Sequence, residues 1–155
     1  MGIGSNSEIF ASAVITLGTV IPANKVSKVV EKISLEALER LVEKTPVDTG
    51  RSRGNWDVTT AGRSMAAADD SRMDKTGGNS KSRGAQVIGE ATKGNKMPKS
   101  IYITNNVDYI EDLENGNSKR QAPEGILNVV VNELVTHYGG IVTPHATDDY
   151  SDLPI

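Results

Sequence analysis

The residues with the clearest potential for chemistry lie near the end of the chain. His137, His145, Asp148 and Asp149 supply imidazole and carboxylate groups, which bind metals and transfer protons. Their spacing suits neither task, because no HExxH or comparable pattern places two ligands on one helix face. We expect these residues to face solvent, and a metal-dependent hydrolase fits the sequence poorly.

Glycine and serine are frequent between residues 61 and 100, which invites a phosphate-binding interpretation. No GxxxxGK[ST] sequence occurs, no strand leads directly into a glycine turn and a helix, and GxSxG is absent. The chain has no Cys, which excludes disulfides, thiolate nucleophiles and cysteine-type zinc sites. The sequence thus predicts no catalytic residue, no metal and no cofactor.

The overall composition predicts one domain with an aliphatic core. The chain has 155 residues, of which 37% are hydrophobic and 4% aromatic, too few for a base-stacking platform or a sugar-binding cleft. A net charge of −3 gives no global attraction to nucleic acid or to anionic membranes. The apolar stretch from Ile9 to Ile21 lacks a basic lead-in and a spanning length, so we expect no membrane contact.

A long amphipathic helix is predicted from Pro22 to Lys44. Apolar residues recur three and four positions apart from Val26 to Leu41, and charged residues fill the other face. Pro46 ends this helix, because proline cannot donate a hydrogen bond and pushes its predecessor out of the α region. Whether residues 8–17 form a shorter helix or an edge strand stays open.

Two short strands are expected, at 55–60 and at 101–104. Trp56 and Val58 alternate with polar residues and should face inward. Asn105 and Asn106 are suited to cap a short helix over 107–114, and Gly116 stands where a helix C-cap needs a positive φ.

Pro123 is predicted to open a last helix, which presents Ile126, Val130 and Leu134 on one face and ends at Gly139. Residues 141–155 form an acidic tail of doubtful order. The expected fold is α+β, a single domain in which the N-terminal and C-terminal helices pack on a small, mostly antiparallel sheet.

Residues 61–100 are predicted to form a long Gly/Ser/Lys-rich loop with at most a short helix near 86–91. So long a loop is uncommon in a compact domain unless it is functional or orders on assembly. Seven basic residues face only Asp74 and Glu90 here, a local excess of five positive charges: Arg72, Lys75, Lys81, Arg83, Lys93, Lys96 and Lys99.

The sequence Thr45-Pro46-Val47-Asp48-Thr49-Gly50-Arg51 describes a compact turn. Proline stops the helix, Asp48 or Thr49 can accept hydrogen bonds from nearby backbone amides, and Gly50 permits a sharp exit. Further along the chain come Arg51-Ser52-Arg53-Gly54-Asn55-Trp56 and Thr104-Asn105-Asn106-Val107-Asp108-Tyr109, then Leu113-Glu114-Asn115-Gly116-Asn117-Ser118 and Gln121-Ala122-Pro123.

This ordered set resembles the tail-component family of tailed bacteriophages typified by gene product ten of a lambdoid coliphage. The family pattern is TPVDTGRxRxxW, a variable insertion, a TNNxxYxxxLExGxSxQAP block and a final helix, and the resemblance spans about residues 25 to 138. Lys119 and Arg120 put two residues where the family usually has one. The motif positions, which either hold the fold or form an interface, are Pro46, Asp48, Thr49, Gly50, Arg51, Trp56, Asn105, Asn106, Tyr109, Glu114, Gly116, Ser118, Gln121, Ala122 and Pro123.

The resemblance implies a non-enzymatic virion protein made in the cytoplasm of a bacterial host. Members are neck, tail-completion or head-tail connector proteins that form a homo-oligomeric ring, hexameric or twelvefold by analogy. The implied partners are a portal-side connector or head-completion protein, a tail terminator or tail tube and sheath proteins, and genomic DNA that passes through without sequence-specific binding.

Two other functions remain open at this stage. A tail terminator that caps the tail tube would resemble the same family, and a DNA-binding accessory protein would use the basic loop. For that loop we expect a mobile segment that orders against an acidic protein neighbour, because strong cationic contacts to phosphates would impede moving DNA.

Overall fold

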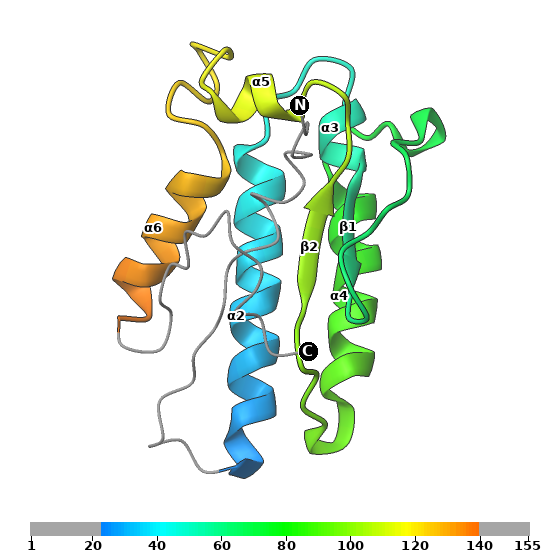
Figure 1. Ribbon diagram of the computed structural model, residues 1–155, viewed down its shortest axis with the longest axis vertical. Coiled ribbons are helices and arrows are strands. Elements are labelled where there is room, and N and C mark those ends of the chain that lie inside the picture. The colour runs from blue at the N-terminus through cyan, green and yellow to red at the C-terminus, as the bar shows by residue number, and fades with distance from the viewer. Residues whose placement is uncertain (1–22, 140–155) are drawn as a thin grey trace, which may run out of the picture.

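Helix α2 (Ala23–Lys44) is the central element of the computed structural model (Figure 1), which describes residues 23–139. Its inward face carries aliphatic side chains, of which Ile33, Leu38 and Val42 are almost fully buried. The predicted helix is thus confirmed from Ala23 onwards. Pro22, His145, Asp148, Asp149, residues 8–17 and the 141–155 tail lie outside the described residues.

The end of α2 is tied to the sheet through one buried hydroxyl. Thr45 Oγ1 donates to the carbonyl oxygen of Leu41 at 2.6 Å and accepts from the indole nitrogen of Trp56 at 2.8 Å. Thr45 and Trp56 are 0% and 1% exposed. A buried indole N–H needs an acceptor, so this pair fixes how the chain turns from α2 into the first strand.

Strands β1 (Trp56–Thr59) and β2 (Tyr102–Asn105) form a two-stranded antiparallel sheet. The register pairs Trp56 with Asn105 and Val58 with Ile103, and both Trp56 and Val58 are buried as predicted. Both predicted strands and their antiparallel pairing are confirmed, and the α+β class with them.

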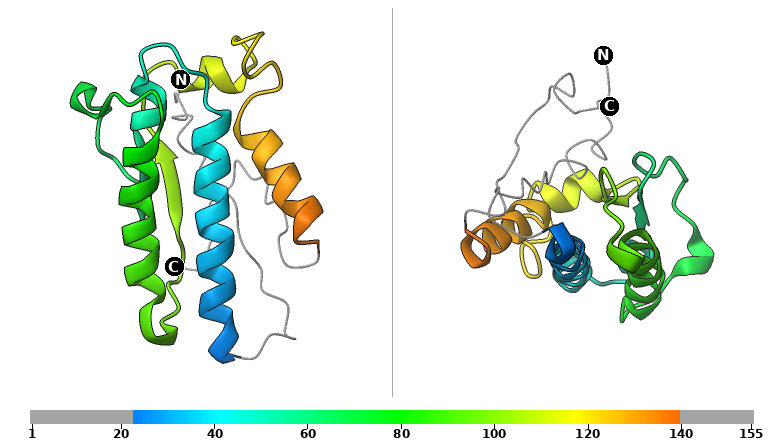
Figure 2. Two further views of the ribbon diagram at one scale, coloured as in Figure 1. Left: turned by 180° about the vertical axis from the view of Figure 1, so that it is seen from behind. Right: turned by 90° about the horizontal axis from the view of Figure 1, so that it is seen from below.

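Residues 61–100 are not the predicted extended loop. An irregular stretch with one 3-10 turn, η1 (Asp70–Arg72), leads into the 15-residue helix α4 (Gly78–Thr92) and a second 3-10 turn, η2 (Lys93–Asn95). Helix α4 lies beside α2 and against β1, as the two views of Figure 2 show. The expectation that residues 71–99 form a loop that orders only on assembly is therefore wrong, because this segment is part of the subunit's own core.

The reason lies in the small residues that suggested a loop. Ser80, Gly84, Ile88 and Thr92, each four positions from the next, form the buried face of α4. A Cβ on Gly84 would lie 2.3 Å from Leu38 Cδ2 and 2.8 Å from Val58 Cγ2. Small side chains at helical spacing let α4 approach α2 and β1 closely, so they serve packing rather than chain flexibility.

The C-terminal helix α6 (Leu127–His137) packs on the side of α2 away from α4 (Figure 1), with Leu127, Val130 and Leu134 buried. It begins four residues later than the predicted start at Pro123. Gly125 adopts φ +83°, a left-handed conformation that interrupts any helix beginning at Pro123. The short helix α5 (Ile110–Glu114) likewise begins after the predicted position 107.

Among the helices that the structure describes, none combines the length and the apolar character needed to cross a membrane.

Candidate functional site

The two sequence blocks that carry the resemblance fold together at one end of the molecule, which we call the motif end: residues 45–56 and 104–123. It follows the end of α2 and contains the short helix α3 (Arg51–Gly54) and α5, which Figure 1 shows close together. Several hydrogen bonds join the blocks directly. Ser52 Oγ donates to Tyr109 Oη at 2.9 Å, and Asn105 Nδ2 donates to the carbonyl oxygen of Ser52 at 2.8 Å.

Gly50 makes the turn after α2 possible. Its φ is +88°, and a Cβ at this position would lie 2.5 Å from the backbone nitrogen of Lys75. The carbonyl oxygen of Gly50 accepts from the amides of Gly54 and Asp74, at 2.9 and 3.1 Å. The glycine is therefore required both by its backbone conformation and by the close approach of a second segment.

Arg51 bridges two carboxylates on different segments. Its Nε donates to Asp70 Oδ1 and its Nη1 to Asp108 Oδ1, both at 2.6 Å, and the guanidinium carbon lies 5.8 Å from the centre of the Tyr109 ring. The Arg51 guanidinium lowers the pKa of Asp108 below its ordinary value. The arginine thus holds η1 and the residues before α5 against the motif end.

Arg53 is a residue that the sequence analysis did not single out, although it occupies the second arginine position of the family pattern. Its Nε donates to the carbonyl oxygen of Thr45 at 2.8 Å, while Nη2 and Nη1 donate to those of Glu43 and Lys75, both at 3.0 Å. The side chain satisfies carbonyls at the end of α2, where a helix leaves its last acceptors without intrahelical partners.

The two asparagines order the chain after β2. Asn105 is fully buried and accepts from the amide of Val107 at 3.2 Å, which starts the turn toward α5. Asn106 Nδ2 donates to the carbonyl oxygens of Ser64 and Ala66, at 2.9 and 2.8 Å. Both side chains satisfy backbone groups, so their role within the subunit is structural.

Glu114 caps helix α6 from a distance in sequence. Its Oε2 accepts from the amides of Ile126 and Leu127, both at 2.8 Å, and its Oε1 from the amide of Asn128 at 3.2 Å. A carboxylate suits this position, because the first amides of a helix lack intrahelical partners and carry partial positive charge.

Gly116 and Pro123 close the loop between α5 and α6. Gly116 has φ +80°, as predicted for a helix C-cap, and a Cβ there would lie 2.3 Å from the carbonyl oxygen of Pro123. The conformation of one residue and the path of the other therefore depend on each other.

The residues Lys119 and Arg120, where the chain departs from the family pattern, occupy an exposed turn. The carbonyl oxygen of Ser118 accepts from the amides of Gln121 and Ala122, at 3.2 and 2.8 Å. Ala122 remains buried, at 4% exposure. The two residues thus form the exposed tip of a turn between half-buried Ser118 and buried Ala122.

A few motif positions remain exposed. Asp48 and Thr49 point to solvent, although Thr49 Oγ1 accepts from the amide of Arg51 at 3.3 Å. Beside them lies an open depression of about 400 Å³, whose lining includes Pro46, Met73 and Tyr109. Met73 is 45% exposed. This depression and its rim are one part of the motif end that a neighbouring protein could contact.

The seven basic residues of the predicted loop do not form one surface. Arg72 pairs with Asp57 at 2.7 Å, Arg83 donates to the carbonyl oxygen of Gly54 at 2.8 Å, and Lys81 lies 3.7 Å from Glu43. Lys75 is exposed near the motif end. Lys93, Lys96 and Lys99 are exposed in the segment between α4 and β2, which Figure 1 shows at the end of the molecule opposite α5.

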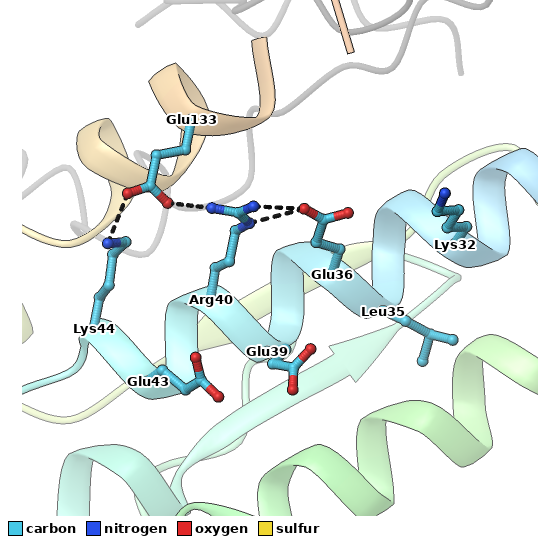
Figure 3. Close-up of a pocket in the computed structure, with 8 residues that line it drawn as sticks. All are labelled: Lys32, Leu35, Glu36, Glu39, Arg40, Glu43, Lys44 and Glu133. Carbon is cyan, nitrogen blue, oxygen red and sulfur yellow. Dashed lines mark hydrogen bonds and ion pairs between the residues drawn. The ribbon is translucent and has the colours of Figure 1, made fainter. Parts of the chain in front are cut away.

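A second feature, which the sequence analysis missed, is a charged groove of about 770 Å³ along α2 and α6 (Figure 3). Arg40 donates to Glu36 at 2.7 Å and to Glu133 at 2.6 Å, and Lys44 lies 2.7 Å from Glu133. Its sequence signal is the spacing of four from Glu36 through Arg40 to Lys44, which also fits an ordinary solvated helix face.

The charged groups in this groove attach helix α6 to helix α2. The hydroxyl of Tyr138 donates to Glu36 and lowers the pKa of that carboxyl, and Lys44 lowers the pKa of Glu133. Burial, with the Glu36 hydrogen bond, raises the pKa of Tyr138 to about 12. Both carboxylates are thus ionised at neutral pH, and the network holds α6 against α2.

Within residues 23–139, no three histidine or carboxylate side chains are grouped so that they could hold a metal ion. His137, from the predicted chemical set, is exposed at the end of α6, with its ring 4.6 Å from that of Tyr138. Comparison with known proteins identifies no matching family model, and no curated protein or solved structure matches significantly.

Proposed function

We propose that this chain is a structural virion protein of a tailed bacteriophage, a neck or head-tail connector subunit that completes the junction between the DNA-filled head and the tail. One observation carries the proposal. The two sequence blocks that resemble the connector family lie about fifty residues apart in the chain, yet they form one hydrogen-bonded end of the subunit.

The nature of these contacts supports a structural interpretation of the shared motif. The motif glycines adopt left-handed conformations, and the motif Asn and Glu side chains satisfy backbone groups. Such positions tolerate few substitutions in any protein that keeps this fold, whatever it binds. Matching them at the family spacing is thus an argument for a shared subunit architecture rather than for a shared catalytic centre.

In this proposal the subunit forms a homo-oligomeric ring, hexameric or twelvefold, that contacts a portal-side connector or head-completion protein and the tail terminator or tail tube. A ring subunit needs two different contact surfaces for its neighbours. The depression beside Asp48, Thr49 and Met73 is one candidate surface. Its mixture of apolar and polar groups resembles a non-obligate interface.

The decisive experiment is a null mutant of the phage that encodes this chain. We expect filled heads and complete tails that fail to join, seen by negative-stain electron microscopy of the lysate, with infectivity restored when the chain is supplied from a plasmid. Normal infectious particles would overturn the proposal.

The same lysate separates the connector from a tail terminator. Loss of a connector leaves tails of normal length, whereas loss of a terminator gives tail tubes of abnormal length. Locating the tagged subunit on isolated heads supports the connector, and finding it on isolated tails supports the terminator.

A further inference from the structure

Five exposed lysines gather at the end of the molecule opposite the motif end. Lys25 and Lys28 lie on the first turns of α2, and Lys93, Lys96 and Lys99 lie in and after η2. Turn η2 packs against α2, and Figure 1 and both views of Figure 2 show the start of α2 beside the end of α4. We call these five residues the lysine end.

Little of the positive charge at the lysine end is compensated by ion pairs within the described residues. Its nearest acidic residues in sequence are Glu31 and Glu90. Within residues 23–139, one ion pair involves these lysines, that of Lys93 with Glu90 at 4.0 Å. Two arginines differ in this respect, since Arg51 is held by Asp70 and Asp108, and Arg40 by Glu36 and Glu133.

The chemistry of this surface fits a phosphate backbone better than a protein surface. Lysine is depleted at protein interfaces, because its flexible, strongly hydrated ammonium group is costly to fix and to desolvate. Binding to a nucleic-acid backbone does not require the ammonium group to be fixed or fully desolvated, because a lysine near a phosphate releases condensed counterions without adopting one geometry. Lys93, Lys96 and Lys99 follow the ordered helix α4, so they do not belong to a loop that has to order against a protein neighbour.

We infer that the lysine end is a binding surface for the phosphate backbone of duplex DNA, without sequence specificity. No arginine or aromatic side chain belongs to the five-residue cluster, so it offers neither bidentate base contacts nor stacking. Binding through up to five lysines is weak and labile to salt, with a dissociation constant of about 10⁻⁴ to 10⁻⁶ M at physiological salt. Contacts of that strength do not prevent DNA from sliding, which removes the objection to cationic contacts with moving DNA.

The inference is tested by fluorescence anisotropy of the purified chain with a labelled 20-base-pair duplex at several salt concentrations. Five phosphate contacts predict a fall in affinity of about 500-fold between 50 and 200 mM salt. The variant K28Q/K96Q/K99Q should reduce this fall to about tenfold. All three side chains are exposed, so its thermal unfolding should match that of the wild type.

A matched control removes the same number of positive charges near the motif end. The variant K75Q/K119Q/R120Q removes three exposed basic residues and should keep the wild-type salt dependence. Equal loss in both variants, or no DNA binding by the wild type at 50 mM salt, would overturn the inference.

If the wild type fails to bind DNA but self-associates, and K28Q/K96Q/K99Q alone loses that association in sedimentation experiments, the surface contacts a second protein copy and the inference is wrong. These results do not depend on the phenotype of a phage null mutant, so the DNA-binding inference and the connector proposal can fail separately.

Discussion

The side-chain amide of Gln121 pairs with the backbone of Val47 across 74 residues of sequence. Its Oε1 accepts from the Val47 amide at 2.8 Å, and its Nε2 donates to the Val47 carbonyl oxygen at 3.2 Å. The turn after α2 and the loop before α6 are thereby joined, although no secondary structure connects them.

Replacing Gln121 by alanine should destabilise the subunit modestly. Both hydrogen bonds are accessible to water, which can replace them, so we expect a loss of about 0.5–1 kcal/mol in the free energy of unfolding measured with urea. The adjacent exposed residue gives the control, because Arg120→Ala should leave the unfolding midpoint unchanged. Equal stability of both variants would show that the Gln121 contact does not hold the two segments.

Two glycines of α4 should respond in opposite ways to the same substitution. Gly84→Ala places a Cβ against Leu38 and Val58 and should destabilise by about 1–3 kcal/mol through overpacking. A Cβ on Gly89 meets no atom within 4 Å, so Gly89→Ala should stabilise by up to about 1 kcal/mol through helix propensity. Thermal melts of the two variants check the position of α4, and a stabilised Gly84→Ala would contradict it.

Loss of the Glu114 cap should weaken helix α6. In Glu114→Gln the charge that faces three helix amides disappears, and one acceptor oxygen is replaced by a donor. We expect destabilisation of about 1–2 kcal/mol and faster hydrogen exchange at the start of α6. Glu111→Gln removes an exposed carboxylate from the same helix α5 and should change neither measurement.

Part of the subunit's folding stability depends on the ionised form of Asp74 and is lost in acid. Hydrogen bonds from the amide of Asn79, then from the hydroxyl and amide of Thr76, lower the pKa of Asp74 to about 2 from an ordinary value of 3.8. Because the folded-state pKa is depressed, this stabilisation is present above pH 4 and is lost as the pH falls from about 4 to 2.

The variant Asp74→Asn should therefore be less stable than the wild type at pH 6, and the difference should shrink below pH 4. Urea unfolding at pH 6, 4 and 2.5 measures it. A difference that stays constant over this range would show that ionised Asp74 does not cap α4.

Substitution of Asp48 tests the interface role of the motif separately from its structural role. It is exposed, so Asp48→Ala should change the stability of the subunit by less than about 0.5 kcal/mol. If the rim of the depression contacts a partner in the particle, the same variant should reduce the yield of joined particles in a complementation assay. Joined particles at wild-type yield would place the contact surface elsewhere. Asn105 is buried, so Asn105→Ala should instead prevent stable folding of the subunit.

The amino-acid sequence determined the elements whose signals are local. Helix α2 follows from its apolar periodicity and from Pro46, and Trp56 and Val58 face inward because strand side chains alternate. Gly116 was recognised as a position of positive φ for the same reason, since that property depends on one residue and its neighbours.

Helix α4 shows where local reasoning failed. Glycine and serine are frequent in this stretch and hydrophobic periodicity is weak, so the sequence predicts a loop. The compensating factors are the Asp74 carboxylate, which accepts from the amide of Asn79, and the close packing of Gly84 against Leu38 and Val58. The cap was visible in the sequence as Asp74 and Thr76 before Gly77, but the packing partners come from distant segments.

The distribution of charge depended on tertiary structure in the same way. Of the basic residues in one stretch of sequence, Arg72 and Lys81 form separate ion pairs. Lys93, Lys96 and Lys99 instead lie in and after η2, which packs against α2, the helix that carries Lys25 and Lys28. Sequence alone could identify the motif blocks and their spacing. Only the fold decided which side chains share a surface. Hydrophobic periodicity is a local property of the sequence, whereas proximity between residues seventy positions apart is set by how the helices pack.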